Sequence, residues 1–118
     1  MIKIAAVSGN VVRVTAPEKL KADDFREITP QVDSILARHG KIRLLVDLSG
    51  FKGWENMEAF ENHTSFIKTH YQKIDRIAVV VGHEWQGWLA GVIKVFLHLN
   101  MRVFDKDHED EALRWIAT

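Results

Sequence analysis

"KIRLLVDL" (residues 41–48) and "RIAVVV" (residues 76–81) are two short runs of leucine and β-branched residues with few polar interruptions. Such runs are typical of strands that a sheet buries on both faces. The segment between them, "WENMEAFENHTSFIKTHYQ" (residues 54–72), has one stripe of residues at helical spacing, formed by Trp54, Met57, Phe60, Thr64, Ile67 and Tyr71. Because neighbouring parallel strands need a long crossover, these segments predict a strand–helix–strand unit at the centre of the fold.

The residues before this unit predict a hairpin and a first helix. Two short apolar runs, residues 2–7 and 11–15, flank the turn "SGN", so we expect the chain to open with a β-hairpin. In residues 19–40 the apolar side chains recur at helical spacing. Gly40 supplies a stop for this helix, and Pro30 is a site for a kink or a late start.

The residues after the unit predict a helix from about Glu84, a short edge strand "MRVF" (residues 101–104) and a last helix "DHEDEALRWIAT" (residues 107–118) with Asp107 as its N-cap. The complete element order is therefore ββα followed by βαβαβα. It predicts one α/β domain over residues 1–118, with a mixed, mostly parallel sheet of about five strands. An N-terminal hairpin opens the sheet, and four helices flank it.

The composition excludes several classes of protein. Sixteen basic and sixteen acidic side chains cancel, so no overall field attracts a nucleic acid, and we expect no such partner. The chain has no cysteine, which excludes disulfides, thiolate chemistry and Cys-ligated zinc. The N-terminal residues lack the apolar core and cleavage site of a signal peptide, so we expect a cytoplasmic protein. The longest apolar stretch, residues 88–99, is shorter than a membrane-spanning helix and could only lie on a bilayer.

The segments "LLVDLSGFKGWENMEAFENHTSFIKTH", "DRIAVVVGHEWQGWLA" and "MRVFDKDHEDEALRWI", in this order, resemble the SpoIIAA-like family, the single-domain bacterial relatives of STAS domains. The resemblance covers nearly the whole chain and implies a fold rather than a reaction. STAS domains that act as anti-sigma factor antagonists carry a phosphorylatable serine after the strand that matches "VDLSG". Here Glu55 and Asn56 stand near that position, and Ser49 lies too early in the turn. The resemblance therefore does not imply a phosphorylation switch.

No catalytic constellation is found. No nucleophile stands beside a base, and neither glycine-containing turn matches a phosphate-binding motif, so we expect a protein that is not an enzyme and that needs no cofactor. His63 and His70 are two helical turns apart, but a third ligand is missing. We interpret both as solvated surface histidines and expect no metal site.

"HEWQGWLAGVIKVFLHLN" (residues 83–100) is apolar around more of its circumference than one sheet contact would bury. One interpretation is a deeply buried helix. The other is a helix that closes over an apolar ligand or dips into a bilayer surface, with Trp85 and Trp88 as interfacial anchors and Gly82 as a hinge. The candidate ligand-binding residues on this helix are Trp85, Trp88, Leu89, Val92 and Phe96; its candidate hinge residues are Gly82, Gly87 and Gly91.

Trp54 and Phe51 follow the strand at residues 41–48, at an end where open α/β sheets tend to bind ligands, and we expect them to line the same pocket. The favoured hypothesis is a non-enzymatic STAS-like module that binds an apolar small molecule or a lipid surface, with peripheral contact at the inner face of the membrane. The alternative is a protein-interaction regulator that resembles anti-sigma antagonists without their serine. A homo-oligomer remains open under both hypotheses.

Overall fold

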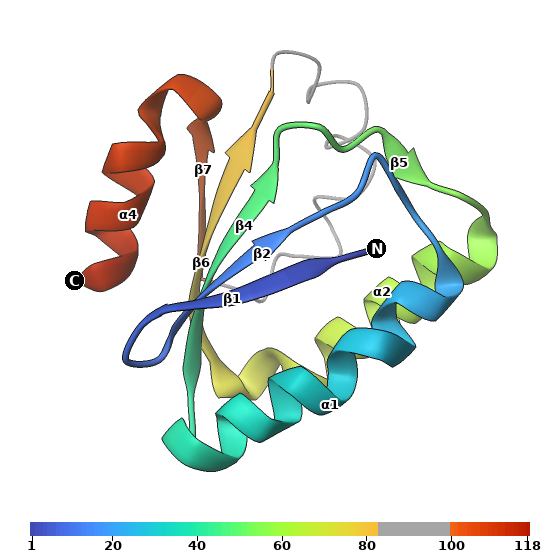
Figure 1. The fold of residues 1–118 in the computed structure, drawn as a ribbon, viewed down its shortest axis with the longest axis horizontal. Coiled ribbons are helices and arrows are strands. Elements are labelled where there is room, and N and C mark those ends of the chain that lie inside the picture. The colour runs from blue at the N-terminus through green and yellow to red at the C-terminus, as the bar shows by residue number, and fades with distance from the viewer. Residues whose placement is uncertain (83–99) are drawn as a thin grey trace.

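The computed structural model describes residues 1–82 and 100–118. These residues form a five-stranded sheet in the order β1-β2-β4-β6-β7 (Figure 1). Its strands are β1 (Lys3–Ser8), β2 (Val11–Thr15), β4 (Ile42–Leu48), β6 (Ile74–Val81) and β7 (Met101–Asp105). β1 and β2 form an antiparallel hairpin, and every other pairing is parallel. The predicted hairpin, central strands and mixed sheet are confirmed.

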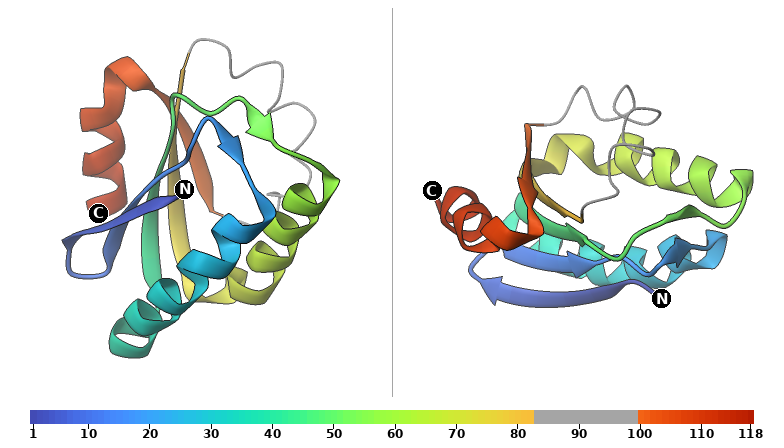
Figure 2. Two further views of the ribbon diagram at one scale, coloured as in Figure 1. Left: turned by 45° about the vertical axis from the view of Figure 1, so that its right-hand side comes forward. Right: turned by 90° about the horizontal axis from the view of Figure 1, so that it is seen from above.

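Helices cover both faces of the sheet. α1 (Ala22–His39) and α2 (Met57–His70) lie on one face, and α4 (Glu109–Ala117) lies on the other (Figures 1 and 2). Residues 1–82 and 100–118 thus contain three α-helices, and the fourth predicted helix, from about Glu84, lies outside the described residues. Within those two ranges, no helix is long and apolar enough to cross a membrane.

Side chains of the central strands point alternately to the two faces of the sheet, and this divides the core into two layers. Leu44 packs in a cluster with Val32 and Leu36 of α1. Leu45, the next residue along β4, packs with Ala112 and Ile116 of α4 on the opposite face. Successive side chains of a strand point to opposite faces, so an unbroken apolar run is what a sheet covered on both faces requires.

The ends of α1 are defined by local hydrogen bonds. Its first turn is closed by Asp24, whose Oδ2 accepts a hydrogen bond from the Lys21 amide at 2.8 Å. At the other end Gly40 has φ 77° and its amide donates to the carbonyl of Leu36, which confirms the predicted stop. The helix continues through Pro30.

A second, two-stranded sheet was not predicted. β3 (Lys19–Leu20) pairs in parallel with β5 (Gly53–Trp54), and this pair leads into the starts of α1 and α2. Trp54 therefore lies in a strand, which corrects the prediction that it starts the helix. α2 begins at Met57, because Oδ1 of Asn56 accepts a hydrogen bond from the Ala59 amide at 2.9 Å and caps the first turn.

The start of the last helix also differs from the prediction. Asp107 is not the N-cap of α4: that position is taken by His108, whose side chain makes no capping hydrogen bond. Asp105 caps the turn before the helix, because its Oδ1 accepts a hydrogen bond from the Asp107 amide at 3.0 Å. A short 3₁₀ turn, η3 (Lys106–His108), follows, and α4 starts at Glu109. Asp107 lies inside that turn, because the strand before it ends in a residue that can itself serve as the cap.

Candidate functional site

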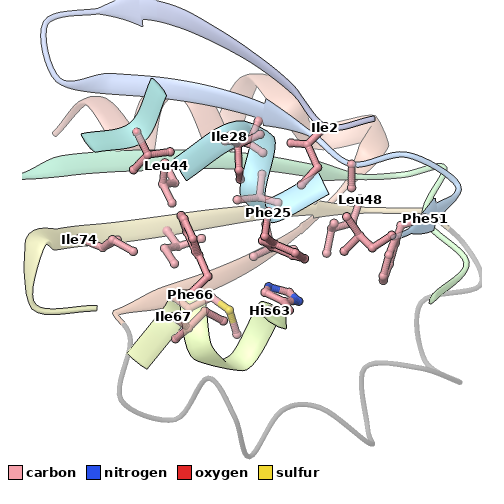
Figure 3. Close-up of a pocket in the computed structure, with 18 of the residues that line it drawn as sticks. Ile2, Phe25, Ile28, Leu44, Leu48, Phe51, His63, Phe66, Ile67 and Ile74 are labelled. Carbon is pink, nitrogen blue, oxygen red and sulfur yellow. The ribbon is translucent and has the colours of Figure 1, made fainter. Parts of the chain in front are cut away.

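An apolar cavity of about 130 Å³ lies between the sheet and the pair of helices α1 and α2 (Figure 3). Its lining comes from both sheets, from both helices and from the turn after β4. The described residues that line it are Ile2, Val14, Ala16, Leu20, Phe25, Ile28, Val32, Ile42, Leu44, Val46, Leu48, Phe51, Trp54, His63, Phe66, Ile67, Ile74, Ile77, Val79 and Met101. None of these side chains carries a full charge at neutral pH if His63 is unprotonated.

Aromatic rings are concentrated along the helical side of the cavity. Phe25 of α1 stacks on the His63 ring of α2, with ring centroids 5.0 Å apart and planes 22° apart. The centroid of Phe66, one turn further along α2, lies 5.8 Å from that of Phe25. These contacts join the two helices on the side of the cavity away from the sheet, and Figure 3 shows Phe25, His63 and Phe66 close together there.

His63 is held in its neutral form. The indole Nε1 of Trp54 donates a hydrogen bond to its Nδ1 at 3.1 Å, which requires that this nitrogen carry a lone pair. Burial lowers the pKa of His63 to about 4. The proton of the neutral ring therefore sits on Nε2, and the cavity wall contains an uncharged imidazole at neutral pH.

Two of the candidate ligand-binding residues lie side by side in the structure. Phe51 and Trp54 both line the cavity, and their rings meet edge to face with centroids 5.2 Å apart. The β3–β5 pairing places them there, because it carries the turn after β4 back over the start of α1. The other candidate ligand-binding residues lie outside the described residues: Trp85, Trp88, Leu89, Val92 and Phe96.

Of the three candidate hinge glycines, only Gly82 is described, and Gly87 and Gly91 lie outside the described residues. Gly82 follows β6 directly. A Cβ atom at this position would lie 2.6 Å from the carbonyl oxygen of Ser49, closer than real Cβ contacts come. The turn after β4 thus packs against the backbone after β6, and this close approach requires glycine.

The interpretation of His63 and His70 as solvated surface histidines was wrong. His63 lines the cavity, and His70 is 6% exposed. Nδ1 of His70 hydrogen-bonds to the carbonyl oxygen of Phe66 at 2.8 Å, and Nε2 to Oδ1 of Asp33 on α1 at 3.0 Å. His70 therefore ties the end of α2 to α1.

The buried face of α2 is rotated relative to the predicted stripe. Ile67 of that stripe is buried, but Met57 near its start is 69% exposed, and Ala59 and His70, which do not belong to it, are buried. A signal was available in the sequence, since His63 stands three residues after Phe60 and three before Phe66. A histidine between two aromatic residues at helical spacing lies on the same face of the helix as those residues. The prediction of a surface position relied only on the usual preference of histidine.

Comparison with known proteins agrees with this architecture. A family model described as SpoIIAA-like matches residues 11–117. The chain belongs to the SpoIIAA-like family. No curated protein matches it. One similar solved structure is that of an uncharacterised protein of the DUF3478 family with a SpoIIAA-like fold, from Shewanella loihica PV-4. It is 24% identical, its TM-score is 0.77, and the match covers 98% of this chain and 92% of that one.

In this SpoIIAA-like protein the side chains of the turn after β4 make hydrogen bonds that stabilise the fold locally. The hydroxyl of Ser49 donates to Oδ1 of Asp47 at 2.7 Å, and its amide donates to the same oxygen at 2.9 Å. Asn56, near the position of the STAS phospho-acceptor, is the cap of α2. Among the described residues, no cluster of three or more metal-ligating side chains forms.

Proposed function

We propose that this SpoIIAA-like protein is a non-enzymatic module that binds an apolar small molecule or a lipid chain in the cavity between its sheet and the helices α1 and α2. The observation that carries the proposal is the cavity itself, whose described lining is apolar apart from the hydrogen-bonded pair Trp54 and His63. Small-molecule sites are commonly of this kind, with an apolar wall and very few polar groups.

The size of the cavity supports an apolar occupant. Its volume of about 130 Å³ is similar to that of engineered apolar cavities of ~150 Å³, which stay dry and bind benzene. Such a space admits a ring or a short length of hydrocarbon chain. Each methylene group transferred into it from water contributes about 0.8 kcal/mol to binding.

The neutral state of His63 supports the same class of ligand. A charged imidazole in this wall would need a counter-ion, whereas the neutral ring accepts the indole N–H and stacks on Phe25. Contact with a lipid surface is a further part of the proposal. It rests on the sequence around Trp85 and Trp88, which lies outside the described residues.

The alternative, a regulator that resembles anti-sigma antagonists, has weaker support. Membership of the family is compatible with it. The turn that would be phosphorylated offers only the Ser49 hydroxyl, which is hydrogen-bonded to Asp47, and its Asn56 caps α2. A partner would have to recognise this turn without a phosphate.

Titration with toluene, an uncharged molecule with a single ring, monitored by the NMR signals of the methyl groups that line the cavity, tests the proposal. Val79→Phe should weaken toluene binding at least about tenfold, because the larger ring fills the cavity from β6. The matched control is Val103→Phe, since Val103 pairs with Val79 in the sheet, is 38% exposed and does not line the cavity.

Circular dichroism and thermal unfolding establish that both variants are folded. Native mass spectrometry of freshly purified protein identifies a co-purifying molecule. If the wild type binds no toluene and carries no apolar molecule, or if the two variants bind toluene equally, the proposal is wrong.

A further inference from the structure

The outer edge of β1 is a candidate surface for association. β1 is the end strand of the five-stranded sheet, and in the described part of the chain β2 is its only partner in that sheet. Most of its residues are exposed on both faces, including Ala5, Ala6 and Val7, the last of which is 47% exposed. An end strand of this kind presents a row of backbone donors and acceptors to solvent.

The hydrogen-bond pattern identifies which groups face outward. The Arg43 amide donates to the Asn10 carbonyl, and the Ala16 amide donates to the Asp47 carbonyl, both at 3.0 Å. The even-numbered residues around and within β2 therefore bond to β4. The backbone N–H and C=O groups of successive residues point to opposite sides of a strand, so those of Arg13 are directed toward β1.

The pairing of the hairpin extends this pattern to β1. Arg13 pairs with Ala5, and Thr15 pairs with Lys3. The backbone groups of Ala5 and Lys3 are therefore directed toward β2, and those of Ile4 and Ala6 are directed away from the sheet.

The composition of this edge lacks the usual protection against pairing. Natural end strands are blocked by proline, by several charges or by a bulge in the middle of the strand. "KIAAVS" has no proline and a single charge, at its start, and its bulge lies at the far end, between Ala6 and Ser8.

We propose that β1 pairs with β1 of a second copy of this chain, antiparallel and with Ala5 on the twofold axis, so that one sheet continues through both subunits. In this register Ile4 of each copy lies opposite Ala6 of the other. The outward backbone groups of these residues form about four hydrogen bonds.

The sequence of β1 is self-complementary in this register. Ile4 and Ala6 lie on the same face of the strand, so their side chains pack side by side across the junction. The residue on the axis, Ala5, is small. Lys3 lies opposite Val7, so the two ammonium groups do not face each other. If the second strand were shifted by two residues so that Ile4 lay opposite Ser8, the bulge between Ala6 and Ser8 would enter the paired region and break the ladder.

A second copy is the occupant that this complementarity favours over an unrelated peptide. One pair of short strands buries less than the ~1,200 Å² of a standard stable interface. The dimer is therefore weak and reversible, and its population rises with protein concentration.

Sedimentation velocity over about a hundredfold range of concentration measures this equilibrium. Ala6→Pro removes the outward amide and leaves the bonds to β2 in place, because proline is tolerated where the amide of an end strand faces solvent. We expect it to weaken dimerisation at least tenfold. The matched control, Ala6→Thr, keeps the amide and favours a strand, and it should dimerise like the wild type.

Amide hydrogen exchange of the wild type provides a second measurement that needs no variant. Raising the protein concentration should slow exchange at Ile4 and Ala6. A wild type that remains monomeric throughout, equal association of the proline and threonine variants, or exchange at Ile4 and Ala6 that does not depend on concentration would overturn the proposal.

Discussion

The indole Nε1 of Trp54 lies 3.1 Å from Nδ1 of His63 and donates a hydrogen bond to it. The two residues come from different elements, the strand β5 and the helix α2. This bond joins the small second sheet to the helical wall of the cavity, and it determines which nitrogen of the imidazole carries the proton. It is the main polar feature of the described cavity lining.

Replacing Trp54 by Phe should raise the pKa of His63. Burial lowers that pKa to about 4, and the indole N–H further favours the neutral ring because it occupies the Nδ1 lone pair. Phenylalanine keeps an aromatic ring and removes the donor. Titration of the His63 ring signals by NMR measures the change, with Phe51→Leu as a control that alters the contact to Trp54 and leaves the donor. A pKa that is the same in Trp54→Phe and wild type would contradict this assignment.

The protein should lose stability as the pH falls from 6.5 to about 4. In this window His63 binds a proton in the unfolded chain, where its pKa is ordinary, and not in the folded chain, where the pKa is lowered. Unfolding is therefore coupled to proton uptake, and the free energy of unfolding decreases toward acid pH by up to roughly 3 kcal/mol from this group.

Urea unfolding at a series of pH values tests this dependence. His63→Phe keeps an aromatic ring that can stack on Phe25, and it cannot titrate. The variant should show a shallower loss of stability than the wild type between pH 6.5 and 4. Identical slopes would mean that His63 is protonated equally in both states.

Gly82→Ala should destabilise the fold by about 2 kcal/mol, since a Cβ atom would lie 2.6 Å from the Ser49 carbonyl oxygen and neither backbone can yield cheaply. Gly50→Ala is the matched control, because a Cβ atom there has no neighbour within 4 Å. Chemical denaturation compares the two. Equal stabilities of the two variants would show that the close approach does not constrain position 82.

Asn56→Ala should cost about 1 kcal/mol, the usual value of a lost N-cap, because the Ala59 amide would lose its acceptor. Asn56→Asp keeps a side-chain oxygen at the same place and should retain the stability. Thermal unfolding distinguishes the two variants. If aspartate and alanine are equally destabilising, the side chain at position 56 matters for a reason other than capping.

Much of the fold could be predicted because it depends on local patterns. The continuous apolar runs that become β4 and β6, with a helical segment between them, determine a parallel pair, and Gly40 ends α1 as expected. The β3–β5 pair could not be predicted. Its strands are two residues long, too short for any periodicity to appear, and their paired residues are 34 positions apart in the sequence.

The sequence by itself determined the α/β class, the hairpin, the order of the central elements and the absence of thiol chemistry, because hydrophobic periodicity and composition are properties of short segments. It also placed Phe51 and Trp54 at the correct end of the sheet. Only the tertiary structure decided that Phe25, His63 and Phe66 meet around one cavity, that His63 is neutral and that His70 binds Asp33. The protonation and burial of a side chain depend on neighbours brought by other elements, and the type of a single residue does not reveal those neighbours.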